Sequence, residues 1–199
     1  MRTVSVTGHG EARVVPDSAV VRVAAAHRAD GVADALGGAD SAARQVIATA
    51  GEFTTPERIG TSSVQIWSDH DQQGNLAGFR ARHALTVRCA DVASAGGLLS
   101  ALAEAVGDRL EVEGVSLEVA DQTAGQRAAR EAAYADAVDR GTHLAGLAGS
   151  ELGDPQAVME GAYADPPVGR AMKASLDAVA LEPGELAVTS SVTVTFQLR

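Results

Sequence analysis

The amino-acid sequence predicts an α+β fold in which antiparallel sheets carry helices packed on one face. Three observations lead to this class. Several stretches alternate apolar and polar residues, which is typical of strands with one buried face. Other stretches carry apolar residues at three- and four-residue spacing, as amphipathic helices do. The patterns occur in the order ββαββ and then αβαββ, and adjacent pairs of strands favour antiparallel sheets.

The chain begins with a strand pattern at Thr3–Thr7, followed by Gly8 and Gly10. The glycine pair could form a phosphate-binding loop, but a dinucleotide fingerprint needs a third glycine and a following helix. Here Pro16 and a second strand, Ala19–His27, follow instead. The pair is therefore interpreted as a bend between two strands.

The first helix is predicted from Val32 to Ala50, with Asp30 as its N-cap. Gly37 and Gly38 lie in the middle of this helix. Each glycine weakens a helix by about 1 kcal/mol relative to alanine. Close packing of the helix on a sheet is expected to compensate for that loss.

Two further strands are predicted at Ile59–Trp67 and Phe79–Cys89, joined by a polar loop. The second of these has apolar side chains on one face and arginines on the other, which indicates an antiparallel strand with one solvated side. A second helix is expected to begin after its cap, Asp91, and to end at Gly107.

The remaining elements are a strand, a long helix and two more strands. The strand at Leu110–Val119 changes parity at Glu113-Gly114, as a β-bulge does. An alanine-rich helix is predicted from Thr123 to Leu147. A short strand is expected around Ala157–Ala162, and a long strand at Leu186–Leu198.

Charge and composition exclude several classes of partner. The chain has 199 residues and a net charge of -10, so it repels phosphate backbones and no nucleic acid is expected to bind. The single cysteine, Cys89, allows neither an internal disulfide framework nor a cysteine-based zinc site. Its position on the apolar face of a strand favours a buried, inert thiol.

The sequence contains no stretch that resembles a membrane span. No apolar run approaches the ~20 residues that a transmembrane helix needs, so no membrane insertion is expected. No export signal is recognised in the chain as given, which favours the cytoplasm. Removal of a signal would place the protein in the periplasm or the cell envelope instead.

The loop Asp69–Asn75 resembles the first half of an EF-hand calcium loop, because oxygen-bearing side chains alternate and a glycine stands sixth. The twelfth position should be a bidentate glutamate, and here it is Arg80. Strands also flank the loop on both sides, so a hairpin turn is the favoured interpretation and a weak calcium site the alternative. The candidate ligands are Asp69, Asp71, Gln73 and Asn75.

Arg80, Arg82 and Arg88 form a short basic stripe on the polar face of one strand. The favoured interpretation is pairing with glutamates of the strand at Leu110–Val119. The alternative is a contact surface for an acidic partner or another subunit. The candidate acidic partners within the chain are Glu111, Glu113 and Glu118.

No catalytic constellation is recognised. The five histidines show no metal-ligand spacing, and His83 is expected to be a hydrogen-bonded core residue. His9-Gly10-Glu11 matches the H-x-E of zinc deaminases, but that chemistry also needs a P-C-x-x-C motif. Ser62 and Ser63 lack the G-x-S-x-G context of a nucleophile. We therefore predict no catalytic, cofactor-binding or metal-binding residue, and an uncharacterised enzyme is kept as an alternative.

Four stretches resemble one known family in order. VSVTGHGEARVVPDSAVV is similar to its opening strand, glycine turn and Pro-Asp pair, and GNLAGFRARHALTVRCADV to its glycine–aromatic–Arg–Ala strand and Asp-capped helix. EGVSLEVADQTAGQRAAREAAYADAVDRGTHLAGLAG is similar to its long alanine-rich helix with the preceding strand, and EPGELAVTSSVTVTFQL to its closing strand. This is the SIMPL-domain family, also called the oxidative-stress defence family, with members similar to a periplasmic immunogenic protein.

The resemblance implies a single SIMPL-like domain over residues 1–199, with two intertwined lobes of about 1–90 and 91–199. It implies a non-enzymatic structural or interaction protein, a homo-oligomer that could also bind another protein. It further implies a link to oxidative-stress tolerance or the cell envelope. Contacts are expected at the excursion Asp165–Gly184, read as mobile, and at the hairpin with Arg80 and Arg82.

Overall fold

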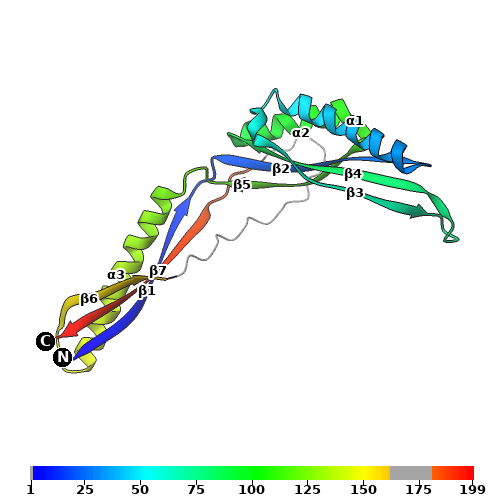
Figure 1. The fold of residues 1–199 in the computed structure, drawn as a ribbon. Coiled ribbons are helices and arrows are strands. Elements are labelled where there is room, and N and C mark those ends of the chain that lie inside the picture. The colour runs from blue at the N-terminus through cyan, green and yellow to red at the C-terminus, as the bar shows by residue number, and fades with distance from the viewer. Residues whose placement is uncertain (1, 162–180) are drawn as a thin grey trace. The chain divides into compact units, whose positions relative to one another are not determined.

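The computed structural model describes residues 2–161 and 181–199 (Figure 1). The fold is α+β, with two antiparallel sheets and three α-helices in the described residues. The elements follow the predicted order ββαββ and then αβαββ. Most of the excursion predicted at Asp165–Gly184 lies outside the described residues.

The chain divides into two compact units, each with its own sheet. Unit 1 consists of Met1–Val15, Asp121–Val168 and Gly184–Arg199. Unit 2 consists of Pro16–Ala120 and Gly169–Pro183. The lobe boundary expected near residue 90 falls inside unit 2, because the elements on either side of that residue share one core. The assignment of residues 1–199 to a single domain stays a prediction.

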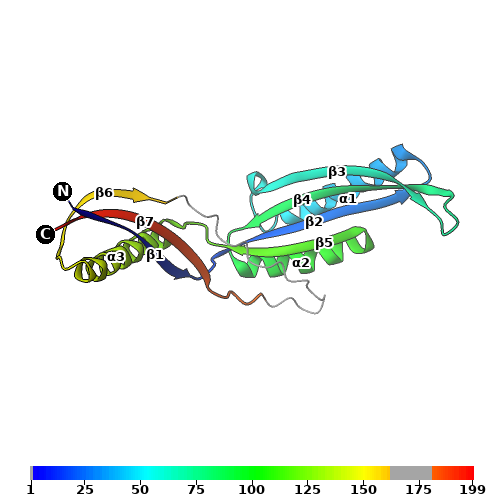
Figure 2. The same cartoon turned by 90° about the horizontal axis from the view of Figure 1, so that it is seen from below.

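Unit 1 is a three-stranded sheet with one helix on it (Figures 1 and 2). The sheet order is β1-β7-β6, and α3 covers one face. The bounds are β1 Thr3–Val14, α3 Thr123–Leu147, β6 Leu152–Glu160 and β7 Leu186–Leu198. The core beneath α3 contains Val6, Ala133, Ala137, Val192, Val194 and Phe196.

Strand β1 runs without a bend through Gly8 and Gly10, so the predicted bend is wrong. The glycines are needed because α3 packs closely on this strand. A Cβ atom at Gly8 would lie 2.1 Å from the carbonyl oxygen of Ala133 and 2.4 Å from the nitrogen of Ala137. A Cβ at Gly10 would also lie 2.1 Å from the α3 backbone. The chain leaves the sheet later, around Pro16, and no helix begins behind the glycine pair.

Unit 2 is a four-stranded antiparallel sheet in the order β3-β4-β2-β5, with α1 and α2 on one face (Figures 1 and 2). Its strands are β2 Ser18–Ala29, β3 Ile59–His70, β4 Leu76–Cys89 and β5 Leu110–Glu118. Its helices are α1 Val32–Ala50 and α2 Val92–Val106, with short 3₁₀ turns η1 Pro56–Arg58 and η2 Gly107–Arg109.

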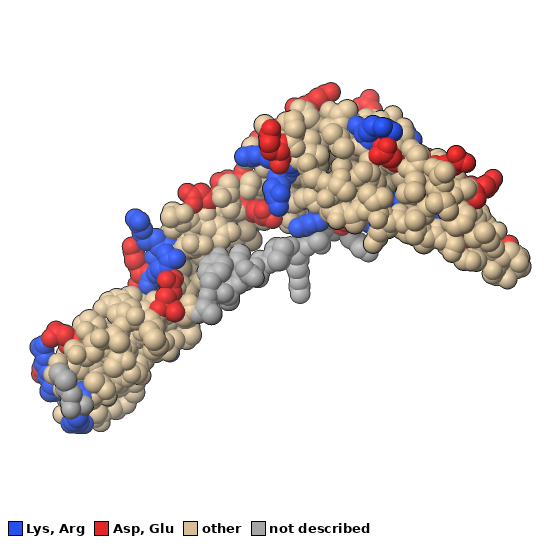
Figure 3. All heavy atoms as spheres, in the orientation of Figure 1, with Lys and Arg blue, Asp and Glu red and all other residues tan. Residues whose placement is uncertain are grey.

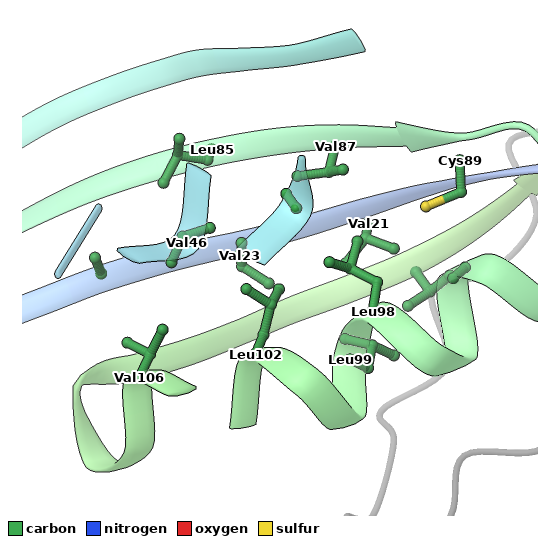
Figure 4. Packing of buried hydrophobic residues seen from close by; sticks show 14 of the residues in the cluster. Val21, Val23, Val46, Leu85, Val87, Cys89, Leu98, Leu99, Leu102 and Val106 are labelled. Carbon is green, nitrogen blue, oxygen red and sulfur yellow. The ribbon is translucent and has the colours of Figure 1, made fainter. Parts of the chain in front are cut away.

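The core of unit 2 is built from valine, leucine and alanine rather than from aromatic rings. β2 and β4 supply the sheet side, and α1 and α2 supply the other (Figure 4). Burying each valine or leucine contributes about 1.5–3 kcal/mol to stability. The labelled core residues are Val21, Val23, Val46, Leu85, Val87, Cys89, Leu98, Leu99, Leu102 and Val106.

Several local predictions are confirmed and others are corrected. The bulge is present, since Arg22 pairs with Gly114 and the next residue, Val23, pairs with Val112. The cap of α2 is confirmed, since Asp91 Oδ1 accepts the N–H of Ser94 at 2.7 Å. The cap of α1 is Gly31 rather than Asp30, and no side chain caps it. The short strand β6 begins at Leu152, earlier than expected. Most of its side chains are exposed, so its sequence shows no apolar–polar alternation that would mark where the strand starts.

The glycines of α1 have different surroundings. A Cβ at Gly38 would lie 2.0 Å from Cδ2 of His27, so the helix packs closely on β2 there as expected. A Cβ at Gly37 would meet nothing within 4 Å, so the predicted compensation does not apply to it. None of the helices that the structure describes combines the length and hydropathy needed to span a bilayer.

Candidate functional site

The loop between β3 and β4 is a hairpin turn, as the favoured interpretation predicts. The N–H of Asp71 donates to the Asn75 carbonyl at 2.9 Å, and the N–H of Gly74 donates to the Asp71 carbonyl at 3.0 Å. Gly74 has a φ of 85°, a left-handed conformation that glycine adopts readily. The turn is therefore held by backbone hydrogen bonds with no need for a metal.

The carboxylates of this loop are occupied by donors from the chain. Asp71 Oδ1 accepts the backbone N–H groups of Asn75 at 2.8 Å and of Gln73 at 2.9 Å. The hydrogen bond from Asn75 is the largest cause that lowers the Asp71 pKa. Asp69 forms an ion pair with Arg28 at 2.9 Å. No group of three or more His, Cys, Asp or Glu side chains in residues 2–161 and 181–199 could hold a metal ion.

Two of the three arginines in the basic stripe on β4, Arg80 and Arg82, are paired with glutamates of β5, which confirms the favoured interpretation for these two. Arg82 Nε lies 2.9 Å from Glu111 Oε2, and Arg82 also pairs with Glu113. Arg80 forms a further ion pair with Glu111. These contacts lie on the sheet face opposite α1 and α2.

The ion pairs span a strand, because β2 lies between β4 and β5. In the register of the sheet, Ala26 of β2 is opposite Arg82 and Ala24 is opposite Glu111. Alanine side chains are short, so the longer arginine and glutamate side chains meet above them. Ala24 is fully buried beneath this layer. The side chains of Arg80, Arg82, Glu111 and Glu113 thus form a charged layer that covers the alanines of β2.

The electrostatics of this cluster favour the charged forms. Burial raises the pKa of Glu111, but hydrogen bonds from Arg82 and Arg80 outweigh it and the net shift is downward. The pKa of Arg82 is raised, chiefly by its hydrogen bond to Glu111. Two arginines and two glutamates compensate one another, which weakens the attraction of the stripe for an acidic partner. Arg88 is exposed and forms no ion pair within the described parts of the chain.

Unit 1 has a hollow of about 760 Å³ between β1 and α3. Polar groups line it, including Ser5, Thr7, Arg140 and His143. The Ser5 hydroxyl lies 2.7 Å from that of Thr195, and Thr7 bonds similarly to β7. These hydroxyls therefore connect two strands of the sheet rather than forming a nucleophile–base pair with His143.

Further side chains that the sequence raised as candidates lie within strands of unit 2. His83 Nε2 lies 2.9 Å from the Thr61 hydroxyl, which confirms a hydrogen-bonded histidine that is largely buried. Cys89 is 1% exposed, and burial raises the pKa of its thiol. Ser62 and Ser63 lie on β3, where Ser62 interrupts the pairing register.

One surface lies outside the sequence predictions, namely the outer edge of β3. In the part of the chain that the structure describes, this strand pairs with β4 and has no neighbour on its other side. Val64 and Trp67 on it are 54% and 42% exposed. Figure 3 shows few charged side chains on the visible surface along β3. One indirect signal is present in the sequence, because no charged residue occurs from Ile59 to Ser68.

Comparison with known proteins gives one family and distant structural matches. The model of the SIMPL family, described as a protein of unknown function (DUF541), matches residues 4–196. No curated protein matches the chain significantly. Four chains of known structure match.

Two of these structures are a hydantoinase/carbamoylase family amidase from Burkholderia ambifaria and AtUAH in complex with glyoxylate. The amidase is 15% identical, with a TM-score of 0.27 over 52% of this chain and 28% of its own. AtUAH is 11% identical, with a TM-score of 0.25 over 56% of this chain and 28% of its own. The chain thus spans about 28% of the length of either structure, and such TM-scores support no argument about function.

Proposed function

The chain belongs to the SIMPL family, and on that premise we propose that it is a non-enzymatic structural and interaction protein that assembles with further copies of itself. The observation that carries the proposal is a group of exposed large apolar side chains on β3, an edge strand of the described sheet. Val64, Ile66 and Trp67 are 54%, 37% and 42% exposed. Apolar side chains gathered on an edge strand are typical of protein–protein contacts.

The use of the polar side chains supports the same function. Arg82 and Glu111 hold β4 and β5 together across β2. The hydroxyls of Ser5 and Thr195 connect β1 to β7. Asp71 closes the β3–β4 turn. These groups stabilise the fold, and the exposed apolar side chains of β3 are available to bind a partner.

Self-assembly is tested by light scattering coupled to size exclusion, and by native mass spectrometry of the same samples. We expect a defined oligomer that persists on dilution through the micromolar range. A single monomeric species at every concentration would contradict the self-assembly proposal. Affinity capture from the native cell tests for a further protein partner.

The proposed link to oxidative stress or the cell envelope rests on the family resemblance. It is tested by deleting the coding gene and measuring survival in peroxide, with the intact gene restored as the control. Cell fractionation decides between the cytoplasm and the periplasm or envelope. Unchanged survival would contradict the link to oxidative stress.

A further inference from the structure

The two sheets have four edge strands in the described chain: β1 and β6 in unit 1, and β3 and β5 in unit 2. An edge strand presents unpaired backbone N–H and C=O groups, so it can pair with a strand of another molecule. Native proteins usually protect such edges with charges, prolines, bulges or covering side chains. The four edges differ in this protection.

The edge of β1 is covered by side chains of α3. The N–H of His9 donates to Asp136 Oδ2 at 2.8 Å, and Arg140 donates to the carbonyl of Thr7 at 3.3 Å. Arg140 and Asp136 also form an ion pair at 2.9 Å. Backbone groups that an incoming strand would need are thus already bound.

The edges of β5 and β6 are protected by their sequences. β5 is nine residues long and carries a bulge together with Glu111, Glu113 and Glu118. β6 contains Pro155, which has no N–H to donate, and its pairing with β7 is irregular on both sides of that residue. Neither edge offers a regular ladder to a second strand.

Within residues 2–161 and 181–199, the edge of β3 has none of these protections over Ser63–Ser68. The strand has no lysine, arginine or proline, and its first acidic residue is Asp69. Its bulge lies earlier, between Thr61 and Ser63, and pairing with β4 is regular from Ser63 to Asp69. The stretch also exposes three large apolar side chains. Val64, Ile66 and Trp67 are 54%, 37% and 42% exposed.

We propose that β3 pairs antiparallel with β3 of a second copy of this chain, about a two-fold axis at Gln65. The inference rests on the proposed self-assembly and names its interface. In this register Val64 of one copy lies opposite Ile66 of the other, so the exposed apolar side chains meet in cross-strand pairs. Trp67 lies opposite Ser63, whose small side chain leaves room for the indole.

The two-fold register keeps the faces of the joined sheet consistent. Residues of equal parity face each other, so the side carrying α1 and α2 in one copy continues into the same side in the other. Gln65 faces its own counterpart, and two amide side chains can exchange a hydrogen bond. Two-fold dimers with self-complementary surfaces are the commonest closed assemblies.

Charge favours a second copy as the occupant of this edge. Each chain carries a net charge of -10, so two copies repel wherever acidic surfaces meet. No charged residue lies between Gly60 and Ser68, so the proposed contact brings no acidic side chains of the two strands against each other. An edge without charge also offers nothing that would select a basic or an acidic peptide.

The test compares two exposed valines on edge strands. Val64→Lys places a charge in the proposed interface, whereas Val158→Lys places it on β6 at nearly the same exposure, 55% against 54%. We expect Val64→Lys to weaken dimerisation about a hundredfold in sedimentation velocity, and Val158→Lys to leave it unchanged. Circular dichroism checks that both variants are folded.

A crosslinking measurement keeps the inference testable if Val64→Lys fails to fold. Residues paired across antiparallel strands lie about 4.5–5.5 Å apart at Cα, a separation that a disulfide can span. Gln65→Cys should therefore form a disulfide-linked dimer on mild oxidation, and Gln156→Cys on β6 should not. The wild-type chain is the control for this measurement, because its one cysteine, Cys89, is buried and should not form a disulfide between copies.

The outcomes separate the two proposals. Wild-type chains that are monomeric at all concentrations would overturn both the self-assembly and the interface. Wild-type oligomers that resist Val64→Lys and give no crosslink through Gln65→Cys would overturn the interface alone. Loss of the dimer in the first variant together with crosslinking in the second would support both.

Discussion

Replacing Gly8 with alanine adds one Cβ atom where β1 and α3 touch. That atom would lie 2.1 Å from the Ala133 oxygen and 2.4 Å from the Ala137 nitrogen, whereas an ordinary contact begins at 3.4 Å. Both neighbours are backbone atoms in the interior of α3, so no side chain can rotate away. The helix must retreat from the strand by on the order of 1 Å, which forfeits much of the contact energy along its alanine face.

The expected cost follows from this geometry. Overpacking a buried site typically costs 1–3 kcal/mol, and a clash with helix backbone should lie at the upper end, about 3 kcal/mol. For a chain of 199 residues, each kcal/mol lowers the melting temperature by about 2–4 °C. The variant should therefore melt about 6–12 °C below the wild type in scanning calorimetry.

Gly37→Ala and Gly146→Ala are matched controls for this change. Both glycines lie in helices, and a Cβ at either position meets nothing within 4 Å. Each substitution should raise stability by about 0.5–1 kcal/mol, because alanine loses less backbone entropy on folding. If Gly8→Ala melts at or above the wild type, close packing is not the reason for the glycine and the argument fails.

Other contacts lead to predictions that are simpler to test. Glu111→Gln leaves two arginines without their shared carboxylate and should cost about 1–2 kcal/mol in urea unfolding, with exposed Arg88→Gln as the unchanged control. The pKa of Glu111 is lowered from its ordinary 4.5, so the stability it provides is present above that pH and is lost as the pH falls through the folded value. The urea midpoint should thus drop on acidification below 4.5, and it should drop less for Glu111→Gln; equal pH dependence would contradict the pairing. Cys89 should react with a thiol reagent about a hundredfold more slowly in the native state than in urea, because it is buried and its thiolate is disfavoured. Millimolar calcium should leave the melting temperature unchanged, since Asp71 already accepts N–H donors, and a rise of several degrees would instead support a calcium site in the loop 69–75.

The sequence predicted the elements well because their patterns are local. The ends of α3, Thr123 and Leu147, are as expected, and the parity change of β5 marked the bulge. The glycine pair was misread although a local signal exists. Gly8 and Gly10 share the parity of Val6, so they continue the buried face of one strand with the smallest residue.

Strand order could not be predicted, because it depends on pairing between distant parts of the chain. Parity placed Arg82 and Glu111 on one face, which was enough to predict their contact. It could not show that β2 lies between their strands, nor that Ala24 and Ala26 make the contact sterically feasible. The open edge of β3 was invisible for the same reason, since an edge is defined by the absence of a neighbour on one side in the described sheet.

The discontinuous make-up of unit 1 has a consequence for the order of folding. β1 must find β7 across a large separation, since paired Ser5 and Thr195 are 190 positions apart. Unit 2 shortens that search once it has formed, because hydrogen bonds hold the two ends of its segment Pro16–Ala120 next to each other. The N–H of Asp17 donates to the Glu118 carbonyl at 3.1 Å, and the N–H of Ala120 donates to Asp17 Oδ1 at 2.7 Å. Once unit 2 has folded, the hundred or so residues between Asp17 and Ala120 no longer count as a flexible loop. The entropic cost of bringing β1 to α3 then falls to that of closing a short loop. We expect unit 2 to form first and to guide the closure of unit 1.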